Sequence, residues 1–251
     1  MKLGLIGAGN MASALARGIG EPVLVFDVVP EKAAALAAST HGEAVETAAQ
    51  VAERADAVAL CHKPGQLDEV AAQLGGRARA IVSILAAVRT DQLADRYPDV
   101  PIYRFIPNIP AELGKGVLCY APGQLASEGP EREVLALLGR AGTVIPLDEH
   151  LIEPAMALMS SGPAFLALVA ESFAGAGQAH GIEASDAARM VVETMAGTAA
   201  WLLAHELDGA ELRARVATPG GVTERGLRVM EESGLPDICR RAVDAVVEAT
   251  R

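Results

Sequence analysis

The sequence predicts a two-part α/β protein, with an N-terminal Rossmann-type domain and an all-α C-terminal domain. Three observations predict it: a glycine-rich turn directly after the first apolar segment, an alternation of apolar runs with helical stretches up to residue 148, and no convincing strand pattern beyond it. Strands that alternate with helices form a doubly wound, mostly parallel sheet. We therefore expect a Rossmann domain over residues 1–148 and a helical domain over residues 149–251.

The strands of the first domain are expected where short apolar runs occur. These runs are Lys2–Gly7, Val23–Asp27, Ala57–Cys61, Ala80–Leu85, Ile102–Phe105, Leu118–Ala121 and Thr143–Pro146. Helical stretches at residues 10–18 and 30–38 separate the first three runs. Because crossovers between parallel strands are right-handed, this order predicts helices on both faces of one sheet.

The helices of the second domain are expected where long, alanine-rich apolar stretches occur. They are Ile152–Met159, Pro163–His180, Ala184–His205 and Leu235–Thr250. A helix that is apolar around most of its circumference has to be buried. We expect this domain to pack against a second subunit; the alternative is packing on its own Rossmann domain alone.

The composition excludes several classes of function. Of 251 residues, 51% are hydrophobic, and 32 acidic against 21 basic residues give a net charge of −11, which disfavours nucleic-acid binding. The three cysteines and five histidines have no metal-ligand spacing, so we expect no metal and a reducing, cytoplasmic compartment. We also expect no signal peptide, and no membrane span, because no run of 18 apolar residues is free of charge and glycine.

The turn after the first strand has the spacing of a dinucleotide-binding fingerprint. Residues 7–12 read G-x-G-x-x-A between a strand and a helix. Gly7 allows the tight turn, Gly9 lets the backbone approach a pyrophosphate, and Ala12 allows close helix–strand packing. The helix N-terminus offers free N–H groups to phosphates. The alternative is a structural glycine turn without a ligand.

Asp27 ends the second predicted strand, where an acidic side chain accepts hydrogen bonds from the adenosine ribose and repels a 2′-phosphate. This favours NADH over NADPH, although Lys32 is near enough in sequence to compensate. The alternative is that Asp27 only caps the helix beginning at Pro30.

Asn108 follows another predicted strand and lies between two prolines. The prolines would form a stiff turn that holds the Asn108 amide in place. The alternative is an ordinary proline-rich loop.

A helix start in the second domain is a candidate carboxylate site. Thr218-Pro219 reads as an N-cap followed by the first helical residue, and Gly220-Gly221 are poor helix formers. Their N–H groups are expected to meet a ligand closely, because no Glu or Gln stands three residues after Thr218 to form a capping box. The hydroxyl of Thr223 is expected nearby. The alternative is an ordinary capped helix.

Taken together, these motifs resemble the pyrroline-5-carboxylate reductase family along nearly the whole chain. The matching segments are 7–12, 63–64, 107–110, 161–165, 218–221 and 226–234. The resemblance implies reduction of the cyclic imine 1-pyrroline-5-carboxylate to L-proline with NADPH or NADH, the last step of proline biosynthesis. It also implies a homodimer or a larger ring of dimers.

The resemblance implies roles for single residues as well. It places the nicotinamide against Lys63, Pro64 and Ala86, and the substrate carboxylate on the backbone of Gly220 and Gly221. The cofactor-binding residues we predict are Gly7, Ala8, Gly9, Asn10, Met11, Asp27, Cys61, His62, Lys63, Pro64, Ala86 and Asn108. The catalytic residues we predict are Thr218, Gly220, Gly221 and Thr223, with Thr223 as the hydroxyl that hydrogen-bonds or protonates the imine nitrogen. The family usually has Val where His62 stands.

Three alternatives remain open at this point. One is a reductase of a related cyclic imine carboxylate, such as the six-membered analogue. A second is a 3-hydroxy-acid dehydrogenase, which needs an acid/base such as Lys on a second-domain helix, and residues 163–180 contain no Lys. A third is a nucleotide-sensing module that binds NAD(P)H without reducing an imine.

Overall fold

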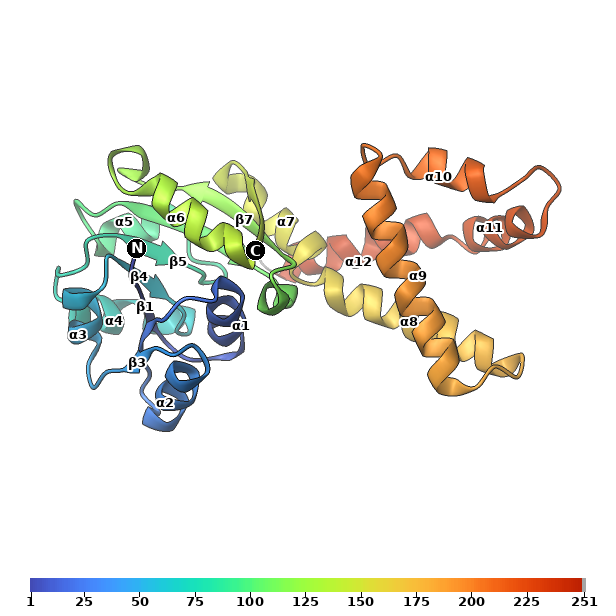
Figure 1. Ribbon diagram of the computed structural model, residues 1–251. Helices are drawn as coiled ribbons and strands as arrows, with labels where there is room; N and C mark the ends of the chain where they lie inside the picture. The colour runs from blue at the N-terminus through green and yellow to red at the C-terminus, as the bar shows by residue number, and fades with distance from the viewer. Residues whose placement is uncertain (250–251) are drawn as a thin grey trace. The chain divides into compact units, whose positions relative to one another are not determined.

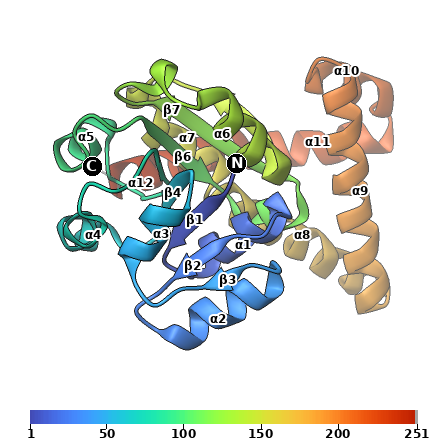
Figure 2. The same ribbon diagram turned by 60° about the vertical axis from the view of Figure 1, so that its left-hand side comes forward.

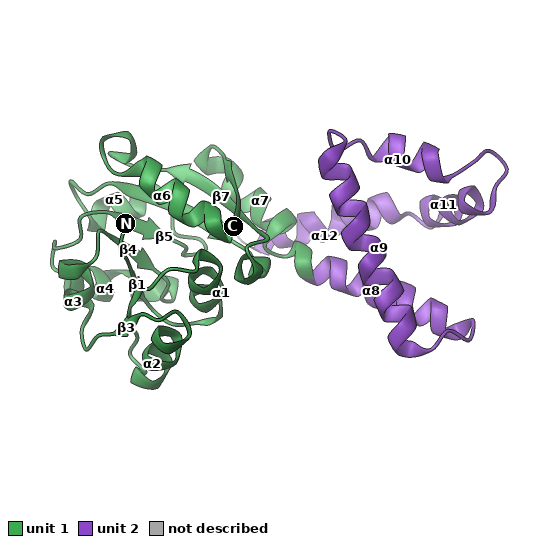
Figure 3. Cartoon of the chain, in the orientation of Figure 1, with its two compact units in different colours: residues 1–163, 250 green, residues 164–249, 251 purple. Residues whose placement is uncertain are grey.

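The computed structural model describes residues 1–249, which form two compact units (Figures 1 and 3). Unit 1 comprises residues 1–163 and unit 2 comprises residues 164–249. Residues 149–163, which we expected to belong to the helical domain, therefore group with unit 1. The expected domain boundary after residue 148 stays a prediction.

Unit 1 contains one eight-stranded sheet in the order β3-β2-β1-β4-β5-β6-β7-β8. The strands are β1 (Leu3–Ile6), β2 (Leu24–Phe26), β3 (Glu43–Ala44), β4 (Ala57–Leu60), β5 (Ile81–Ser83), β6 (Ile102–Pro107), β7 (Gly116–Pro122) and β8 (Gly142–Pro146). All neighbouring strands run parallel except β6 and β7, so the sheet is mostly parallel, as predicted. The strand order reverses between β1 and β4, which opens a crevice at their carboxyl ends.

Helices cover both faces of the sheet (Figure 2). The helices of unit 1 are α1 (Asn10–Ile19), α2 (Pro30–Ser39), α3 (Ala48–Arg54), α4 (Leu67–Leu74), α5 (Thr90–Arg96), α6 (Glu131–Leu138) and α7 (Ile152–Met159). Short 3₁₀ turns are η1 (Pro64–Gln66), η2 (Ile109–Leu113), η3 (Ala126–Glu128), η4 (Gly139–Ala141) and η5 (Glu149–Leu151). Strand β4 shows why both faces need cover: Ala57 and Ala59 pack with α1, α2 and α6, whereas Val58 and Leu60 pack with α3, α4 and α5.

The secondary structure of unit 2, within its described residues, is helical, with short loops between the helices. The helices are α8 (Gly162–Ala179, which starts in unit 1), α9 (Ala184–Ala204), α10 (Gly209–Val216), α11 (Val222–Glu232) and α12 (Leu235–Ala249). Thr250, the expected end of the last helix, lies outside the described residues. Only Ala174 and Ala187 of this unit are buried, while large apolar side chains such as Leu203 are exposed. A single copy of the unit therefore has no core of its own.

One helical stretch, residues 149–179, is apolar and long enough to cross a membrane by length and composition alone. We expected no such stretch, because Glu153, Glu171 and several glycines interrupt it. Only 17% of its most apolar window is buried within this chain. Helices that are buried in a soluble assembly have the same composition, so this stretch is weak evidence for a membrane span.

Candidate functional site

A cavity of about 390 Å³ lies at the carboxyl ends of β1, β2 and β4, where the strand order reverses. Its lining residues come from the ends of β1 and β2, from the loops that follow β1, β2 and β4, and from α2, η1 and α4. They are Ile6, Gly7, Gly9, Phe26, Asp27, Val28, Val29, Lys32, Cys61, His62, Lys63, Gln66, Glu69, Val70 and Gln73. This is the position where an open α/β sheet binds a dinucleotide.

Gly7 and Gly9, the two glycines of the first turn, are explained by different structural features. Gly7 has φ +107°, and a Cβ there would lie 2.7 Å from the carbonyl oxygen of Cys61, so packing requires glycine. Gly9 is the N-cap of α1, and a Cβ there would meet no heavy atom within 4 Å. No side chain caps this helix N-terminus. The open space and the free N–H groups fit a phosphate ligand.

Asp27 is fixed at the wall of the cavity by two hydrogen bonds. The N–H of Ala8 donates to its Oδ2 at 2.7 Å, and the N–H of Val29 donates to its Oδ1 at 2.8 Å. The N-cap of α2 is Val29. Asp27 therefore braces the glycine turn against the second strand, and it does more than cap the following helix.

The residues after β4 present a thiol and an imidazole to the same cavity. Burial raises the pKa of the Cys61 thiol to about 12, so it stays protonated at neutral pH. The Nδ1 atom of His62 lies 2.9 Å from the carbonyl oxygen of Lys63, and burial lowers the pKa of His62. The Nε2 atom of His62 is buried and has no hydrogen-bond partner among residues 1–249.

Asn108 is buried and its side chain bonds within unit 1. Its Nδ2 donates to the carbonyl oxygen of Met159 at 2.8 Å, and its Oδ1 accepts the N–H of Val117 at 2.9 Å. The amide thus ties β6 to β7 and to the end of α7. Ala86 is exposed in the turn after β5, where the next residue, Ala87, has φ +57°.

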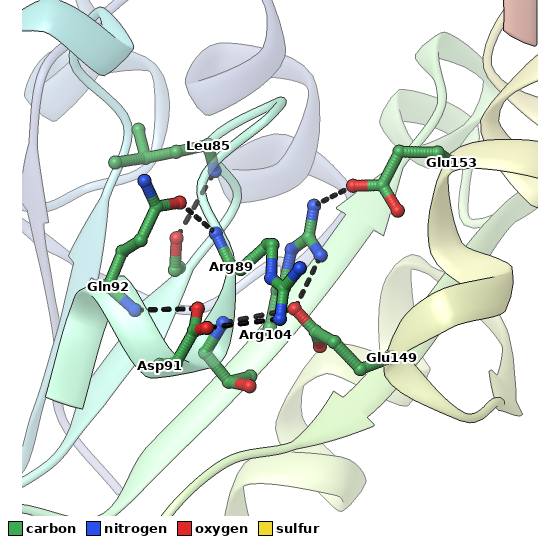
Figure 4. A network of polar contacts seen from close by, with 9 residues as sticks. Leu85, Arg89, Asp91, Gln92, Arg104, Glu149 and Glu153 are labelled. Atoms are coloured by element: carbon green, nitrogen blue, oxygen red, sulfur yellow. Dashed lines mark hydrogen bonds and ion pairs between the residues drawn. The ribbon is translucent and has the colours of Figure 1, made fainter. Parts of the chain in front are cut away.

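A buried ionic network near that turn escaped the sequence analysis (Figure 4). The fully buried Arg104 of β6 donates to Glu149 at 2.7 Å and to Glu153 at 3.0 Å. Glu149 also accepts the N–H of Thr90, the first residue of α5, at 3.0 Å. The network therefore joins β6 and α7 to the end of the turn that carries Ala86. Its members lie 45 and 49 residues apart, too far for a sequence pattern to connect them.

The helix start in unit 2 differs from the expected one. Residues 218–221 form a turn in which the N–H of Gly221 donates to the carbonyl oxygen of Thr218 at 2.8 Å, and Gly220 has φ +75°. Pro followed by a positive-φ glycine is typical of a type II turn. Helix α11 begins only at Val222, with Gly221 as its N-cap.

Because the helix begins later than predicted, different amides are free. Glu224 stands three residues after the N-cap Gly221, and its Oε2 accepts the N–H of Gly220 at 2.7 Å. The prediction that the amides of Gly220 and Gly221 are free is therefore wrong. The N–H groups of Val222 and Thr223 have no acceptor within residues 1–249.

The structure brings together six of the predicted cofactor-binding residues on the cavity wall. These six are Gly7, Gly9, Asp27, Cys61, His62 and Lys63. Ala8, Asn10, Met11, Pro64, Ala86 and Asn108 do not line the cavity, and their roles stay predictions. Of the predicted catalytic residues, Thr218, Gly220 and Gly221 lie in the turn before α11 and Thr223 lies in its first helical turn, all in unit 2, and their roles also stay predictions. Sequence reasoning missed Gln66, Glu69 and Gln73, which lie on η1 and α4 after β4; a search of the first turn after that strand would have found Gln66 but not Gln73, which lies near the end of α4.

Comparison with known families gives two matches on this chain. The family described as "Pyrroline-5-carboxylate reductase dimerisation" matches residues 149–251. The family described as "NADP oxidoreductase coenzyme F420-dependent" matches residues 2–87.

Individual relatives match the chain over its full length. A pyrroline-5-carboxylate reductase of Synechocystis sp. is 30% identical over all of this chain and 95% of its own length. The solved structure of a pyrroline-5-carboxylate reductase from Coxiella burnetii has a TM-score of 0.89 at 25% identity, covering 99% of this chain and 97% of that one. A pyrroline carboxylate reductase from Plasmodium falciparum, solved with NADP bound, has a TM-score of 0.88 at 22% identity, covering 100% and 97%.

Proposed function

The chain belongs to the pyrroline-5-carboxylate reductase family, and on that premise we propose that it reduces 1-pyrroline-5-carboxylate to L-proline with NAD(P)H. The observation that supports the proposal most is the cavity at the strand-order reversal, with an open approach to Gly9 and an uncapped helix N-terminus. A bound dinucleotide would supply the hydride for the imine carbon, and the imine nitrogen would gain one proton. The products are a secondary amine and the oxidised dinucleotide.

Unit 1 would hold the dinucleotide. The pyrophosphate fits the N-terminus of α1, because Gly9 leaves space there and the helix dipole favours anions. Asp27 faces the cavity where a ribose would offer its hydroxyls. Cys61, a protonated thiol at the end of β4, is not set up as a nucleophile.

Unit 2 would hold the substrate carboxylate at the start of α11. The free N–H groups of Val222 and Thr223 are donors for an anion in a chain whose net charge is −11. The hydroxyls of Thr218 and Thr223 lie in the same turn and first helical residues, where they would hydrogen-bond the carboxylate and the imine nitrogen. A hydroxyl is sufficient there, because the protonated imine is already the better hydride acceptor.

We also propose that the active form is a homodimer joined through unit 2 and located in the cytoplasm. The exposed apolar side chains of this unit and the dimerisation family that matches residues 149–251 support the first statement. Cys61, Cys119 and Cys239, all described and all free of disulfides, support a reducing compartment.

The experiment is to follow oxidation of NADH and of NADPH with 1-pyrroline-5-carboxylate and with its six-membered homologue. We expect turnover with the five-membered imine, and little with the larger ring. Thr218→Ala and Thr223→Ala should each raise KM for the imine and lower kcat/KM, because each removes a donor to substrate. Faster turnover of the six-membered ring would contradict the substrate assignment, and unchanged kinetics in both variants would remove the hydroxyls from the site.

A further inference from the structure

The turn between β5 and α5, residues 84–89, lies beside the cavity wall. Strand β5 is the parallel neighbour of β4, and the N–H of Ile84 donates to the carbonyl oxygen of Leu60 at 3.2 Å. The turn therefore starts next to Cys61, which lines the cavity. In the proposed function the pyrophosphate lies at β1 and a ribose at β2. The opposite half of a dinucleotide, with its nicotinamide, would therefore extend past β4 toward this turn.

The tip of this turn is held by the residues on either side of it. Ala86 and Ala87 are exposed, and Ala87 has φ +57°, a left-handed conformation that is unfavourable for a residue with a Cβ. Such a conformation persists only where its surroundings enforce it. On the β5 side, the N–H of Leu85 donates to the hydroxyl of Ser83 at 3.3 Å. On the other side, the turn depends on how the first residues of α5 are fixed.

Glu149 of η5 fixes the start of α5. Its Oε1 accepts the N–H of Thr90, the first residue of α5, at 3.0 Å, and also an Nη1 hydrogen of Arg104 at 2.7 Å (Figure 4). The guanidinium cannot turn away, because Arg104 is fully buried and its Nη2 donates to Glu153 at 3.0 Å. Hydrogen bonds between charged groups are short and strong. Strand β6 thus fixes the carboxylate of Glu149, and this carboxylate fixes the end of the turn.

We propose that Glu149 is a positioning residue for hydride transfer: through the N–H of Thr90 it holds the β5–α5 turn in place as a wall for the nicotinamide. Glu149 does not line the cavity, so it acts through the turn and not on the dinucleotide itself. The inference rests on the proposed function in that the cavity binds a dinucleotide with its nicotinamide on the β5 side. It does not depend on which imine is reduced.

Two variants break the contact from opposite sides. Glu149→Ala removes the acceptor, and Thr90→Pro removes the donor. Proline suits the first residue of a helix, and Arg89 before it has φ −85° and ψ 162°, a conformation that a following proline permits. Thr90→Ala keeps the N–H and is the control for Thr90→Pro. Glu153→Ala is the control for Glu149→Ala, because it removes a carboxylate of nearly equal exposure from the same guanidinium, and Glu153 makes no hydrogen bond to Thr90.

The test is calorimetric titration of the purified protein with NADH and with ADP-ribose, which lacks the nicotinamide. We expect Glu149→Ala and Thr90→Pro to weaken NADH binding about tenfold and to change ADP-ribose binding less than about twofold, because only the nicotinamide half reaches the turn. Glu149→Gln keeps an acceptor oxygen and should lose less. Thr90→Ala and Glu153→Ala should bind both ligands as the wild type does.

Turnover gives a second readout. At saturating NADH, kcat for 1-pyrroline-5-carboxylate should fall about tenfold or more in Glu149→Ala and Thr90→Pro, because a misplaced nicotinamide transfers its hydride slowly. KM for the imine should stay constant, since we assign the imine to the start of α11.

Equal weakening of NADH and ADP-ribose binding would show that the variants loosen unit 1 as a whole, and it would overturn the inference. Wild-type NADH binding by Thr90→Pro would overturn it as well, as would the same loss in Glu153→Ala as in Glu149→Ala. Thermal unfolding shows which variants are folded at the titration temperature, and Thr90→Pro with Glu149→Gln carries the test where Glu149→Ala is not. The expected binding pattern in a wild type that reduces no imine would contradict the proposed function alone.

Discussion

Gly9 and Gly18 lie at the two ends of α1, and a side chain would meet very different surroundings at each. At Gly9 a Cβ meets no atom within 4 Å, whereas at Gly18 it would overlap the carbonyl oxygen of Ala111, 1.8 Å away. The backbone at Gly9 has an ordinary φ of −74°, so the fold itself does not require glycine there. The structure thus separates a glycine that leaves space for a ligand from one that allows helix packing.

Gly9→Ala and Gly18→Ala make a matched pair on one helix. We expect Gly9→Ala to change the free energy of unfolding by less than about 1 kcal/mol, and to weaken dinucleotide binding about tenfold or more, because the methyl group enters the phosphate space. Gly18→Ala should lower the free energy of unfolding by about 1–3 kcal/mol through overpacking. Urea denaturation and nucleotide titration measure the two effects; unimpaired binding by Gly9→Ala would remove that space from the cofactor site.

Glu224 offers a second test at the scale of one residue. Its carboxylate occupies the N–H of Gly220, beside the amides that we propose for the substrate carboxylate, and no cation within the described chain forms an ion pair with it. A negative charge there competes with an anionic substrate. Glu224→Gln and Glu224→Ala are therefore expected to lower KM for 1-pyrroline-5-carboxylate about tenfold. A tenfold change corresponds to roughly the free energy that one hydrogen bond to a charged group contributes.

The control for Glu224 is Glu232→Gln, which removes the same charge from the exposed far end of α11. It should leave KM unchanged. The uncharged analogue 1-pyrroline provides a second control, because it has no carboxylate to be excluded, so its KM should not fall in the Glu224 variants. A KM for 1-pyrroline-5-carboxylate that stays constant or rises when Glu224 is replaced would show that this side chain lies outside the substrate site.

The start of α11 shows why residue-level predictions from sequence reach a limit. Thr218-Pro219 is a common N-cap sequence. The amino-acid sequence does not distinguish it from a type II turn, after which the helix begins three residues later. The positive φ of Gly220 decides between them, and that is a backbone property. By contrast, the Gly7–Ala12 turn was predicted in place, because a fingerprint between a strand and a helix has one common geometry.

At the scale of elements, predictions succeeded where apolar periodicity is strong. All seven expected strands are present, and Ile152–Met159 has the expected bounds. The two-residue strand β3, which is exposed, and the polar helix α10 were missed, and α3, α4, α5 and α6 were expected only as unplaced helices between the strands. Elements that bury little surface leave little apolar pattern in the sequence.

The Arg104 network makes a prediction at this scale, because it holds several elements of unit 1 together. Arg104→Met leaves Glu149 and Glu153 without their cation, so we expect the free energy of unfolding to fall by about 3–5 kcal/mol. Glu153→Gln keeps an acceptor for the guanidinium and should cost less. Thermal unfolding followed by circular dichroism measures both changes.

A surface ion pair provides the control for this network. Arg132→Met breaks the ion pair between Arg132, whose side chain is almost fully exposed, and Glu133. Because exposed ion pairs contribute little stability, this variant should not shift the unfolding midpoint. Because Glu149 also fixes the first residue of α5 after the turn with Ala86, Glu149→Gln should raise KM for the dinucleotide. Equal midpoints for Arg104→Met and Arg132→Met would show that the buried network does not hold these elements together.

At the scale of the whole molecule, the exposed apolar surface of unit 2 needs a partner. Leu166, Val169 and Phe173 follow one side of α8 at helical spacing, and between 40% and 57% of each residue is exposed. Such a stripe is unfavourable in water and favourable in a symmetric contact with a second copy. The sequence predicted a second subunit because the helices of this domain are apolar around most of their circumference. It did not single out this stripe, because the side of such a helix that stays exposed is known only from the fold.

Leu166→Glu places a charge in this stripe and is expected to produce a monomer, because a carboxylate in an apolar interface loses its hydration without gaining a partner. Leu113→Glu is the control: its residue is more exposed, at 78%, but belongs to η2 in unit 1. Size-exclusion chromatography with light scattering should give a dimer or a multiple of it for the wild type and for Leu113→Glu, and a monomer for Leu166→Glu. The wild-type unfolding midpoint should rise with protein concentration, since subunit association stabilises only the folded chain. A monomeric wild type at tens of micromolar, or a midpoint independent of concentration, would contradict dimerisation through this surface.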